Sequence, residues 1–452
     1  MTRSRDAWRW TAALILVAFF AALVAACGDD DDDDGGGGGN GGGSNQSDTS
    51  GRSNQQLGDV DVLGIWGAEE LTNFESMVAP WQSDTGGRVN FTGTRNITAE
   101  LTLRVEGGNP PDIAIPAEVG LFQQFARDGR IISLDQCEGL EDLVRDNYPD
   151  AFVELATVDG KLYGFFMKAD TKATIWYSPQ TFEDMNMEPL DADASFDDLV
   201  ELSQRFVDAG LPPWSIGLES AETSGWPGSD WIQQIILNEH GEDVYDGLID
   251  GSVPFTDDRV KDAWEKFGQI ALTDGFTVQG GATGINATNF QDATYPPFTD
   301  PPGAAMVYLG GFAAEFIQEQ FPDLEPGTGF DFFTFPGGAV TGGANIVYAF
   351  NNDPATCSLM TYLASADAQK IWVEAGGFTS VNTEVDLDAY PDEVARRQAE
   401  QLLEADSFRF DLDDAIGGGL QQAYFTGITQ YLQNPGQLDS ILQSIEGSRG
   451  TD

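Results

Sequence analysis

The most constraining feature of the sequence is a regular alternation of strand-like and helix-like segments. Strand-like runs occupy residues 60–66, 88–92 and 112–115, and apolar residues recur at helical spacing over 71–81 and 97–105. A pair of glycines follows each helical stretch, which is typical of a helix end. The order strand–helix–strand–helix–strand favours a parallel sheet with helices packed on its faces. The sequence therefore predicts an α/β fold.

The N-terminal segment predicts a location outside the cytoplasm. A basic start is followed by an apolar run from Trp10 to Val24 and then by Val-Ala-Ala directly before Cys27. The run is too short for an ordinary spanning helix and has about the length of a signal-peptide core. It resembles a bacterial lipobox, in which the cysteine is lipidated and becomes the new N-terminus. We expect residues 1–26 to be a lipoprotein signal peptide. The alternative is a transmembrane anchor in which Cys27 is incidental.

Residues 27–57 predict a tether. Six aspartates from Asp29 to Asp34 precede a run of glycines and a Gly/Ser/Asn/Gln stretch. Such a composition cannot bury apolar surface, so we expect a disordered linker held to the membrane by lipid at Cys27. The protein would then lie at the extracytoplasmic face of the cell membrane, without spanning it.

Length and charge limit the remaining possibilities. The rest of the chain is too long for one core and suits two domains. The net charge of −52 disfavours nucleic acid and anionic lipid as partners. Such a surface either attracts a cationic ligand or serves only to keep the protein soluble.

The scarcity of cysteine and histidine excludes several chemistries. His240 is the only histidine, so a His-rich zinc site is impossible, and its place at a helix end suits a structural role. Cys137 and Cys357 either pair or remain two buried thiols. No phosphate-binding glycine motif occurs, so nucleotide binding lacks support. We expect no cofactor and no metal.

Several short phrases, in a fixed order behind the lipobox, indicate a family. They are Arg104–Asp112 (RVEGGNPPD), Tyr163–Asp170, Gly225–Pro227, Asp230–Ile232, Val253–Asp257, Tyr362–Ser365 and Gly376–Phe378. Together they resemble the extracellular solute-binding lipoproteins of ABC sugar importers, and most of all the alpha-glucoside-binding branch.

The resemblance implies a two-lobed periplasmic-binding-protein-like fold of type II, with two interleaved α/β lobes joined by hinge crossings. We expect residues 58–168 and 302–345 to form the N-terminal lobe. Residues 169–301 and 346–452 would form the C-terminal lobe. The hinge candidates are Lys168–Asp170 and Ala344–Ile346. Closure would be a hinge motion, stabilised by contacts that the ligand makes in the closed state.

Candidate ligand-binding residues are aromatic and polar residues at turns and strand ends, because aromatic rings cover the C–H face of a sugar and polar groups bond its hydroxyls. They are Trp66, Glu69, Arg95, Asp170, Trp226, Asp230, Trp231, Tyr308, Gly310, Phe312 and Phe378. Trp66 and Trp231 could instead be core residues, and Arg95 a surface charge. For Asp170 the alternative is a helix cap or an exposed acid.

The resemblance implies a binding protein and not an enzyme. It would capture an alpha-glucoside or another di- or oligosaccharide, act as a monomer, and deliver the sugar to an ABC permease. One alternative is the same fold binding a cationic solute such as a polyamine, which would use the acidic surface and aromatic side chains. Another is a secreted glycoside hydrolase with two catalytic carboxylates.

Overall fold

The computed structural model describes residues 57–450 except 95, 192, 404 and 406. The expected alternation near the start is confirmed. It consists of β1 (Asp59–Gly64), α1 (Ala68–Thr85), β2 (Arg88–Gly93), α2 (Ile97–Glu106) and β3 (Ile113–Ile115). Strand β1 pairs in parallel with both β2 and β3. Because both faces of this sheet are covered, neighbouring residues of β1 are buried together, as Val62 and Leu63 show.

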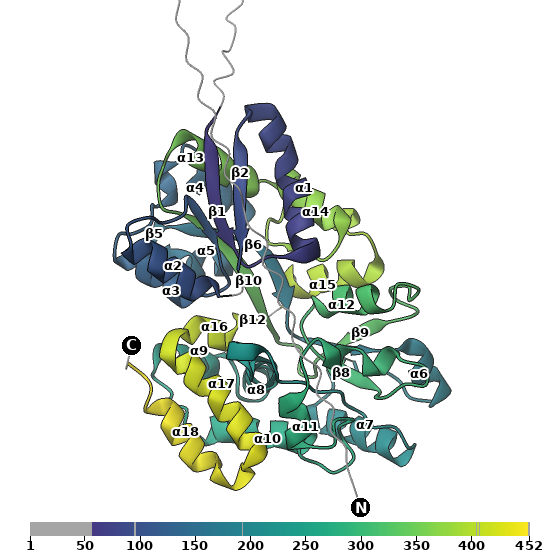
Figure 1. The fold of residues 1–452 in the computed structure, drawn as a ribbon. Helices are drawn as coiled ribbons and strands as arrows, with labels where there is room; N and C mark the ends of the chain where they lie inside the picture. The colour runs from purple at the N-terminus through teal and green to yellow at the C-terminus, as the bar shows by residue number, and fades with distance from the viewer. Residues whose placement is uncertain (1–56, 95, 192, 404, 406, 451–452) are drawn as a thin grey trace, which may run out of the picture. The chain divides into compact units, whose positions relative to one another are not determined.

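The main sheet has seven strands in the order β11–β6–β10–β3–β1–β2, with β12 paired to β10. Its other strands are β6 (Gly164–Thr171), β10 (Val340–Ala349), β11 (Thr379–Ser380) and β12 (Phe408–Phe410). In Figure 1, α1 and α14 (Ala366–Ala375) lie on one side of these strands, and α2 and α3 (Val119–Arg127) lie on the other.

A second, three-stranded sheet has the order β8–β7–β9, with β7 (Thr174–Tyr177) antiparallel to both β8 (Met306–Tyr308) and β9 (Asp331–Thr334). The backbone passes from the main sheet to this one between β6 and β7, and it returns between β9 and β10. The two long strands of these crossings pair antiparallel, with Gly343 opposite Asp170 and Ala344 opposite Ala169. Both hinge candidates therefore lie side by side in one strand pair.

The remaining elements are mostly helices. The first core receives α4 (Leu140–Asn147), α5 (Asp150–Leu155), the hairpin β4 (Thr157–Val158) and β5 (Lys161–Leu162), and α13 (Pro354–Leu363). The second core receives α6 (Pro179–Asp184), α7 (Phe196–Asp208), α8 (Trp226–His240), α9 (Glu242–Asp250), α10 (Asp258–Ala271), α11 (Ala282–Ala287), α16 (Leu412–Ile416), α17 (Gly418–Gln433) and α18 (Leu438–Glu446). Helix α12 (Ala313–Gln320) packs in a third, smaller hydrophobic cluster around Trp176 and Phe330. Helix α15 (Glu393–Leu403) contributes Val394 to this cluster and Leu402 to the first core. None of the helices in the described residues is long and apolar enough to cross a membrane.

The packing divides the chain differently from the expected lobe boundaries. Segment 302–345 was expected in the first lobe, but Tyr308 and Phe333 pack in the second core because β8 and β9 pair with β7. Segment 346–452 was expected in the second lobe, but α13 and α14 pack in the first core. The reason is that β10 pairs with β3 at Tyr348 and Ala349 and returns the chain to the main sheet. Only from α16 onward does the chain pack in the second core.

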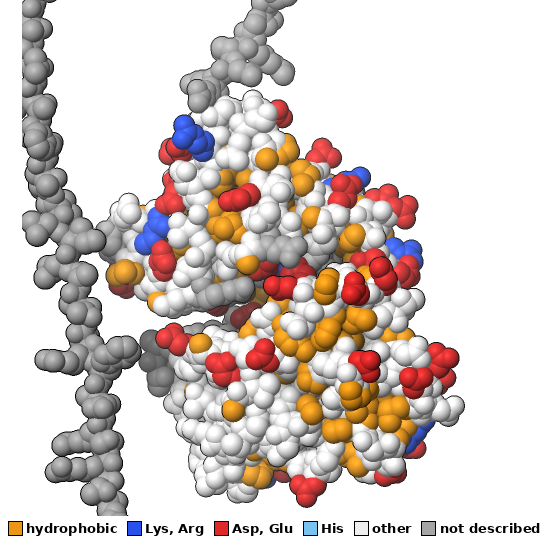
Figure 2. All heavy atoms as spheres, turned by 45° about the vertical axis from the view of Figure 1, so that its right-hand side comes forward, with side chains coloured by type: hydrophobic (Ala, Val, Ile, Leu, Met, Phe, Trp, Pro, Cys, Tyr) orange, Lys and Arg blue, Asp and Glu red, His pale blue; other side chains and the backbone are white. Residues whose placement is uncertain are grey.

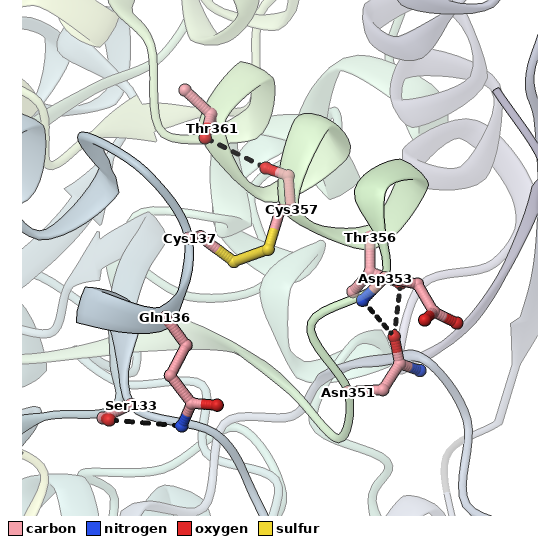
Figure 3. Close-up of a disulfide and its surroundings, with 8 residues drawn as sticks. All are labelled: Ser133, Gln136, Cys137, Asn351, Asp353, Thr356, Cys357 and Thr361. Carbon is pink, nitrogen blue, oxygen red and sulfur yellow. Dashed lines mark hydrogen bonds between the residues drawn. A yellow bond between two sulfur atoms is a disulfide. The ribbon is translucent and has the colours of Figure 1, made fainter. Parts of the chain in front are cut away.

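A disulfide joins distant parts of the chain within the first core. Cys137 follows a short 3-10 turn, and Cys357 lies in α13, with the two Cα atoms 5.2 Å apart and the two cysteines separated by 220 positions in the sequence (Figure 3). Of the two possibilities that the sequence left open, the structure has the paired cysteines. The bond ties α13 to the segment before α4, after the chain has passed through the second core and returned.

Replacing both cysteines by serine should lower the free energy of unfolding by about 3 to 5 kcal/mol, because the bond closes a very long loop and restricts the unfolded chain. Urea unfolding of the wild type and of Cys137→Ser/Cys357→Ser measures the difference. A reductant should shift the wild-type midpoint and leave that of the double variant in place. Equal midpoints for the two proteins would contradict the prediction.

Candidate functional site

A cavity of about 200 Å³ opens where the end of β6 meets α12, the turn between α14 and β11, and α15. Aromatic and apolar side chains line it together with polar ones. The lining residues that matter most are Asp170, Phe312, Glu315, Phe378, Tyr390, Asp392 and Gln398. Its described lining holds three carboxylates and no lysine or arginine. The face in Figure 2 has the same character, with more acidic than basic side chains along the hollow between its upper and lower parts.

Gly377 allows α12 to approach the turn after α14. This residue has a φ of 69°, and a Cβ added to it would lie 1.4 Å from Oε1 of Glu315. A side chain is therefore excluded on two grounds, backbone conformation and space. The structure therefore brings the Glu315 carboxylate against Gly377.

Lys168 holds together carboxylates from different parts of the chain. Its Nζ lies 3.2 Å from Oε1 of Glu70 in α1 and 3.7 Å from Oδ2 of Asp170. Burial opposes its charge, but Asp170, Glu70 and Glu315 outweigh burial and raise the pKa of Lys168. Burial also raises the pKa of Asp170, against the lowering effect of Lys168. Asp170 keeps 23% of its side chain exposed, at the cavity.

Lys172, between β6 and β7, also pairs with carboxylates from distant parts of the chain. Its Nζ lies 3.0 Å from Oδ2 of Asp230 in α8 and 3.4 Å from Oδ2 of Asp411 before α16. The ammonium also lies 4.6 Å from the ring centre of Trp226 and 5.6 Å from that of Phe312. Burial opposes the charge, yet the carboxylates raise the pKa of Lys172. The Lys172 ammonium thus holds the start of α16, helix α8 and the rings of Trp226 and Phe312 in place relative to one another.

Further carboxylates surround this second cluster. Burial, followed by the charge of Asp411, raises the pKa of Asp413 to about 7. Burial also raises the pKa of Asp414, with Asp413 the next cause and Glu118 of the segment before α3 a further one. Helix α3 contacts α16, and the Cα atom of Gly417 would lie 3.8 Å from a Cβ added to Gly120. Acidic groups of the first and second cores therefore meet across this contact.

Three of the predicted ligand residues line the cavity: Asp170, Phe312 and Phe378. Gly310 lies beside it, and a Cβ there would come within 2.7 Å of the Phe312 ring, so glycine is required for the ring's position. Trp226 and Asp230 are brought together by Lys172, next to the same ring.

Three other candidates lie in the cores. Trp66 is 1% exposed, its Nε1 donates to Oδ1 of Asn345 at 3.2 Å, and its ring packs on Phe91 and Trp372. Trp231 and Tyr308 pack on each other in the second core, with ring centres 4.7 Å apart. Both tryptophans are therefore core residues, which was the alternative that the sequence left open. Neither they nor Tyr308 lines the cavity.

The remaining candidates fall outside what the structure describes. Cys27 and Arg95 lie outside the described residues. Glu69 lies in the first turn of α1, and its side chain is not among those described.

Sequence reasoning missed most of the polar lining. Glu315, Tyr390 and Gln398 lie on or beside helices that appear amphipathic and ordinary in the sequence. The lysines carried a usable signal: Lys168 and Asp170 stand at alternate positions of the buried strand β6, and Lys172 follows at the same spacing just after its end. Charged residues at a period of two in such a strand require partners on one face.

The match to a family model decides the identity of the chain. Residues 76–399 match the family of bacterial extracellular solute-binding proteins. The chain belongs to this family. The expected resemblance is therefore confirmed at the level of the family, and the protein is an extracytoplasmic solute-binding protein rather than an enzyme.

Two similar relatives extend over nearly the whole chain. The osmoprotective compounds-binding protein of Synechocystis sp. is 32% identical over 398 residues, covering 86% of this chain and 92% of its own. The alpha-glucosides-binding periplasmic protein of Rhizobium meliloti is 30% identical over 395 residues, covering 84% of each.

Solved structures confirm the fold. The bacterial solute receptor AcbH superposes with a TM-score of 0.74 at 18% identity, covering 87% of this chain and 99% of its own. Maltose-bound MalE3 of T. maritima gives a TM-score of 0.67 at 15% identity, covering 86% and 98%. The α/β periplasmic-binding-protein fold expected from the sequence is therefore correct.

Removing the Lys172 ammonium should strongly destabilise the solute-binding protein. Lys172→Met leaves Asp230 and Asp411 buried without their cation, and the expected loss is about 3 to 5 kcal/mol in urea unfolding. Adding Asp230→Asn to Lys172→Met should restore part of the loss. Lys370→Met, which breaks an exposed pair with Glu374, should cost at most about 1 kcal/mol. Equal losses for Lys172 and Lys370 would contradict the prediction.

Stability should fall as the pH rises from about 4 to about 7, because Asp413 holds its proton in the folded protein over a range in which it loses it when unfolded. In that range the folded state binds more protons, so its free energy of unfolding decreases with pH. Thermal unfolding at about pH 5 and about pH 7.5 measures the slope. Asp413→Asn should flatten it, whereas Asp128→Asn, on the surface, controls for the loss of a charge. An unchanged slope in Asp413→Asn would refute this role.

Proposed function

We propose that this protein is the carbohydrate-binding component of an ABC importer and that it captures an alpha-glucoside or a similarly small glucosylated solute. The observation that carries the proposal is the identity of 30% or more, over nearly the whole chain, to two binding proteins whose names specify alpha-glucosides and osmoprotective compounds. A di- or oligosaccharide remains the expected ligand class.

The chemistry of the cavity supports this class. Phe312 and Phe378 supply apolar surface for the C–H face of a sugar ring. Asp170, Glu315 and Gln398 supply acceptors and an amide for its hydroxyl rim. The cavity lies below the range of about 300 to 1,000 Å³ usual for ligand pockets, which favours a compact solute over a long oligosaccharide.

The two crossings between the sheets would allow the two cores to close on a bound solute. Asp170 lies on β6 at the cavity, and β6 pairs with β10 between the two cores. A solute that contacts α12 on one side and the turn after α14 on the other would favour the arrangement in which both sides touch it. We propose that Lys168–Asp170 and Ala344–Ile346 absorb the hinge motion.

The partners follow from the same proposal. The protein would be anchored by lipid at Cys27 on the extracytoplasmic face of the cell membrane. It would act as a monomer and pass its solute to the membrane subunits of an ABC permease. A cationic solute such as a polyamine remains the second candidate, because the charged residues of the described cavity lining are all carboxylates.

Calorimetric titration of the purified protein tests the proposed ligand class. Trehalose, maltose and sucrose represent the neutral glucosides, and spermidine represents the cationic alternative. We expect one glucoside to bind with a dissociation constant near micromolar, about −8 kcal/mol, and to be recovered intact. Binding of spermidine alone, abolished by salt, would overturn the proposal in favour of the second candidate.

Truncating an aromatic residue of the cavity should weaken glucoside binding. Phe312→Ala removes apolar surface that the sugar ring would cover, so we expect about tenfold weaker binding, or about 1.4 kcal/mol. Phe350→Ala removes a partly buried ring of the first core that does not line the cavity, and it serves as the matched control. Calorimetry measures both. Equal affinities for Phe312→Ala and wild type would show that the sugar binds elsewhere.

A further inference from the structure

We infer that the cavity selects carbohydrates without negative charge and binds an amino-substituted glycoside more tightly than the matching neutral one. The inference rests on the proposed function, because it assigns a charge preference to the same cavity. It goes beyond that function by predicting which derivatives of one sugar are accepted and which are refused.

The first step is the charge of the lining. Asp170, Glu315 and Asp392 come from three different elements, and the described lining contains no lysine or arginine. In a cavity of about 200 Å³ an anionic substituent would share a small space with all three carboxylates. Like charges at such distances interact strongly when solvent is excluded. A carboxylate or phosphate on the sugar is therefore disfavoured.

The second step is that Lys168 and Lys172, which contact the lining residues Asp170 and Phe312, already have carboxylate partners of their own. Lys168 has a side chain only 4% exposed and already pairs with Glu70 and Asp170. Lys172, at 11%, pairs with Asp230 and Asp411. Each of these two ammonium groups is thus already shared between two carboxylates of the protein. A bound anion would have to compete with them for each ammonium.

The third step concerns a positive substituent. The protein already holds one buried ammonium, that of Lys172, between carboxylates and the rings of Trp226 and Phe312. The cavity presents the same combination: carboxylates of Asp170 and Glu315 together with the rings of Phe312 and Phe378. Carboxylates with aromatic rings stabilise an ammonium group by Coulomb attraction and by cation–π contacts. An amino group on the sugar should therefore gain affinity.

The experiment compares derivatives of one sugar that differ at a single position in the charge of the substituent. Calorimetry first identifies which of trehalose, maltose and sucrose binds to the purified protein. The 6-carboxylate and the 6-amino-6-deoxy derivatives of that sugar are then titrated at low and at high salt. We expect the carboxylate to bind at least tenfold more weakly and the amine at least threefold more tightly than the neutral sugar. Both differences should shrink in high salt, which separates charge from a steric effect at that position.

Two variants test whether the cavity carboxylates cause the preference. Glu315→Gln and Asp392→Asn keep the size of the side chains and remove two of the three charges, so together they should reduce both ratios at least threefold. Asp392 caps α15 through the Ala395 amide, and asparagine can keep that hydrogen bond. Glu201→Gln, on the exposed side of α7, is the matched control and should leave both ratios unchanged.

The outcomes separate this inference from the proposed function. Equal affinities for the carboxylate and the neutral sugar, or an amine that binds no more tightly, would overturn the charge preference while leaving glucoside capture intact. Ratios unaffected by Glu315→Gln/Asp392→Asn would overturn its assignment to the cavity. If no neutral sugar binds at all, the proposed function itself fails.

Discussion

The antiparallel pair of β6 and β10 determines how the rest of the molecule is arranged. One end of each strand belongs to the main sheet, where Tyr348 pairs with Ala114, and the other leads directly to the strands of the second sheet. The chain crosses between the two cores in these adjacent strands and again between β12, which pairs with β10, and α16, so these connections lie close to one strand pair. The cavity lies at the end of β6, so any change in the crossing also changes the position of Asp170 relative to α12.

Charge burial on this strand pair connects stability with function. Lys168 and Lys172 stand two residues before and after Asp170. Lys168 pairs with Glu70 of α1 and with Asp170 itself, and Lys172 pairs with Asp230 of α8 and Asp411 before α16. A buried ion pair contributes little net stability compared with apolar packing, although removing one partner is costly. These clusters thus fix the positions of Trp226, Phe312 and Asp170 more than they add stability, and we propose that this positioning serves the solute site.

The sequence predicted the α/β alternation and the family, because strand and helix periodicities are local and the family phrases are contiguous. The lobe boundaries were wrong where they depended on pairing between distant segments, since nothing local indicates that β8 and β9 pair with β7. Residue type alone could not separate Phe312, which lines the cavity, from Trp231, which is buried among other rings. Glu315 could not be found because its role depends on Gly377, more than sixty positions away.

The central claim is that this family member captures a small glucoside in the acidic, aromatic cavity at the end of β6. A crystal structure of the protein with the glucoside that calorimetry selects tests it most directly. The claim predicts the sugar in contact with Asp170, Phe312 and Phe378, with both α12 and the turn after α14 touching it. A sugar bound away from these three residues would contradict it.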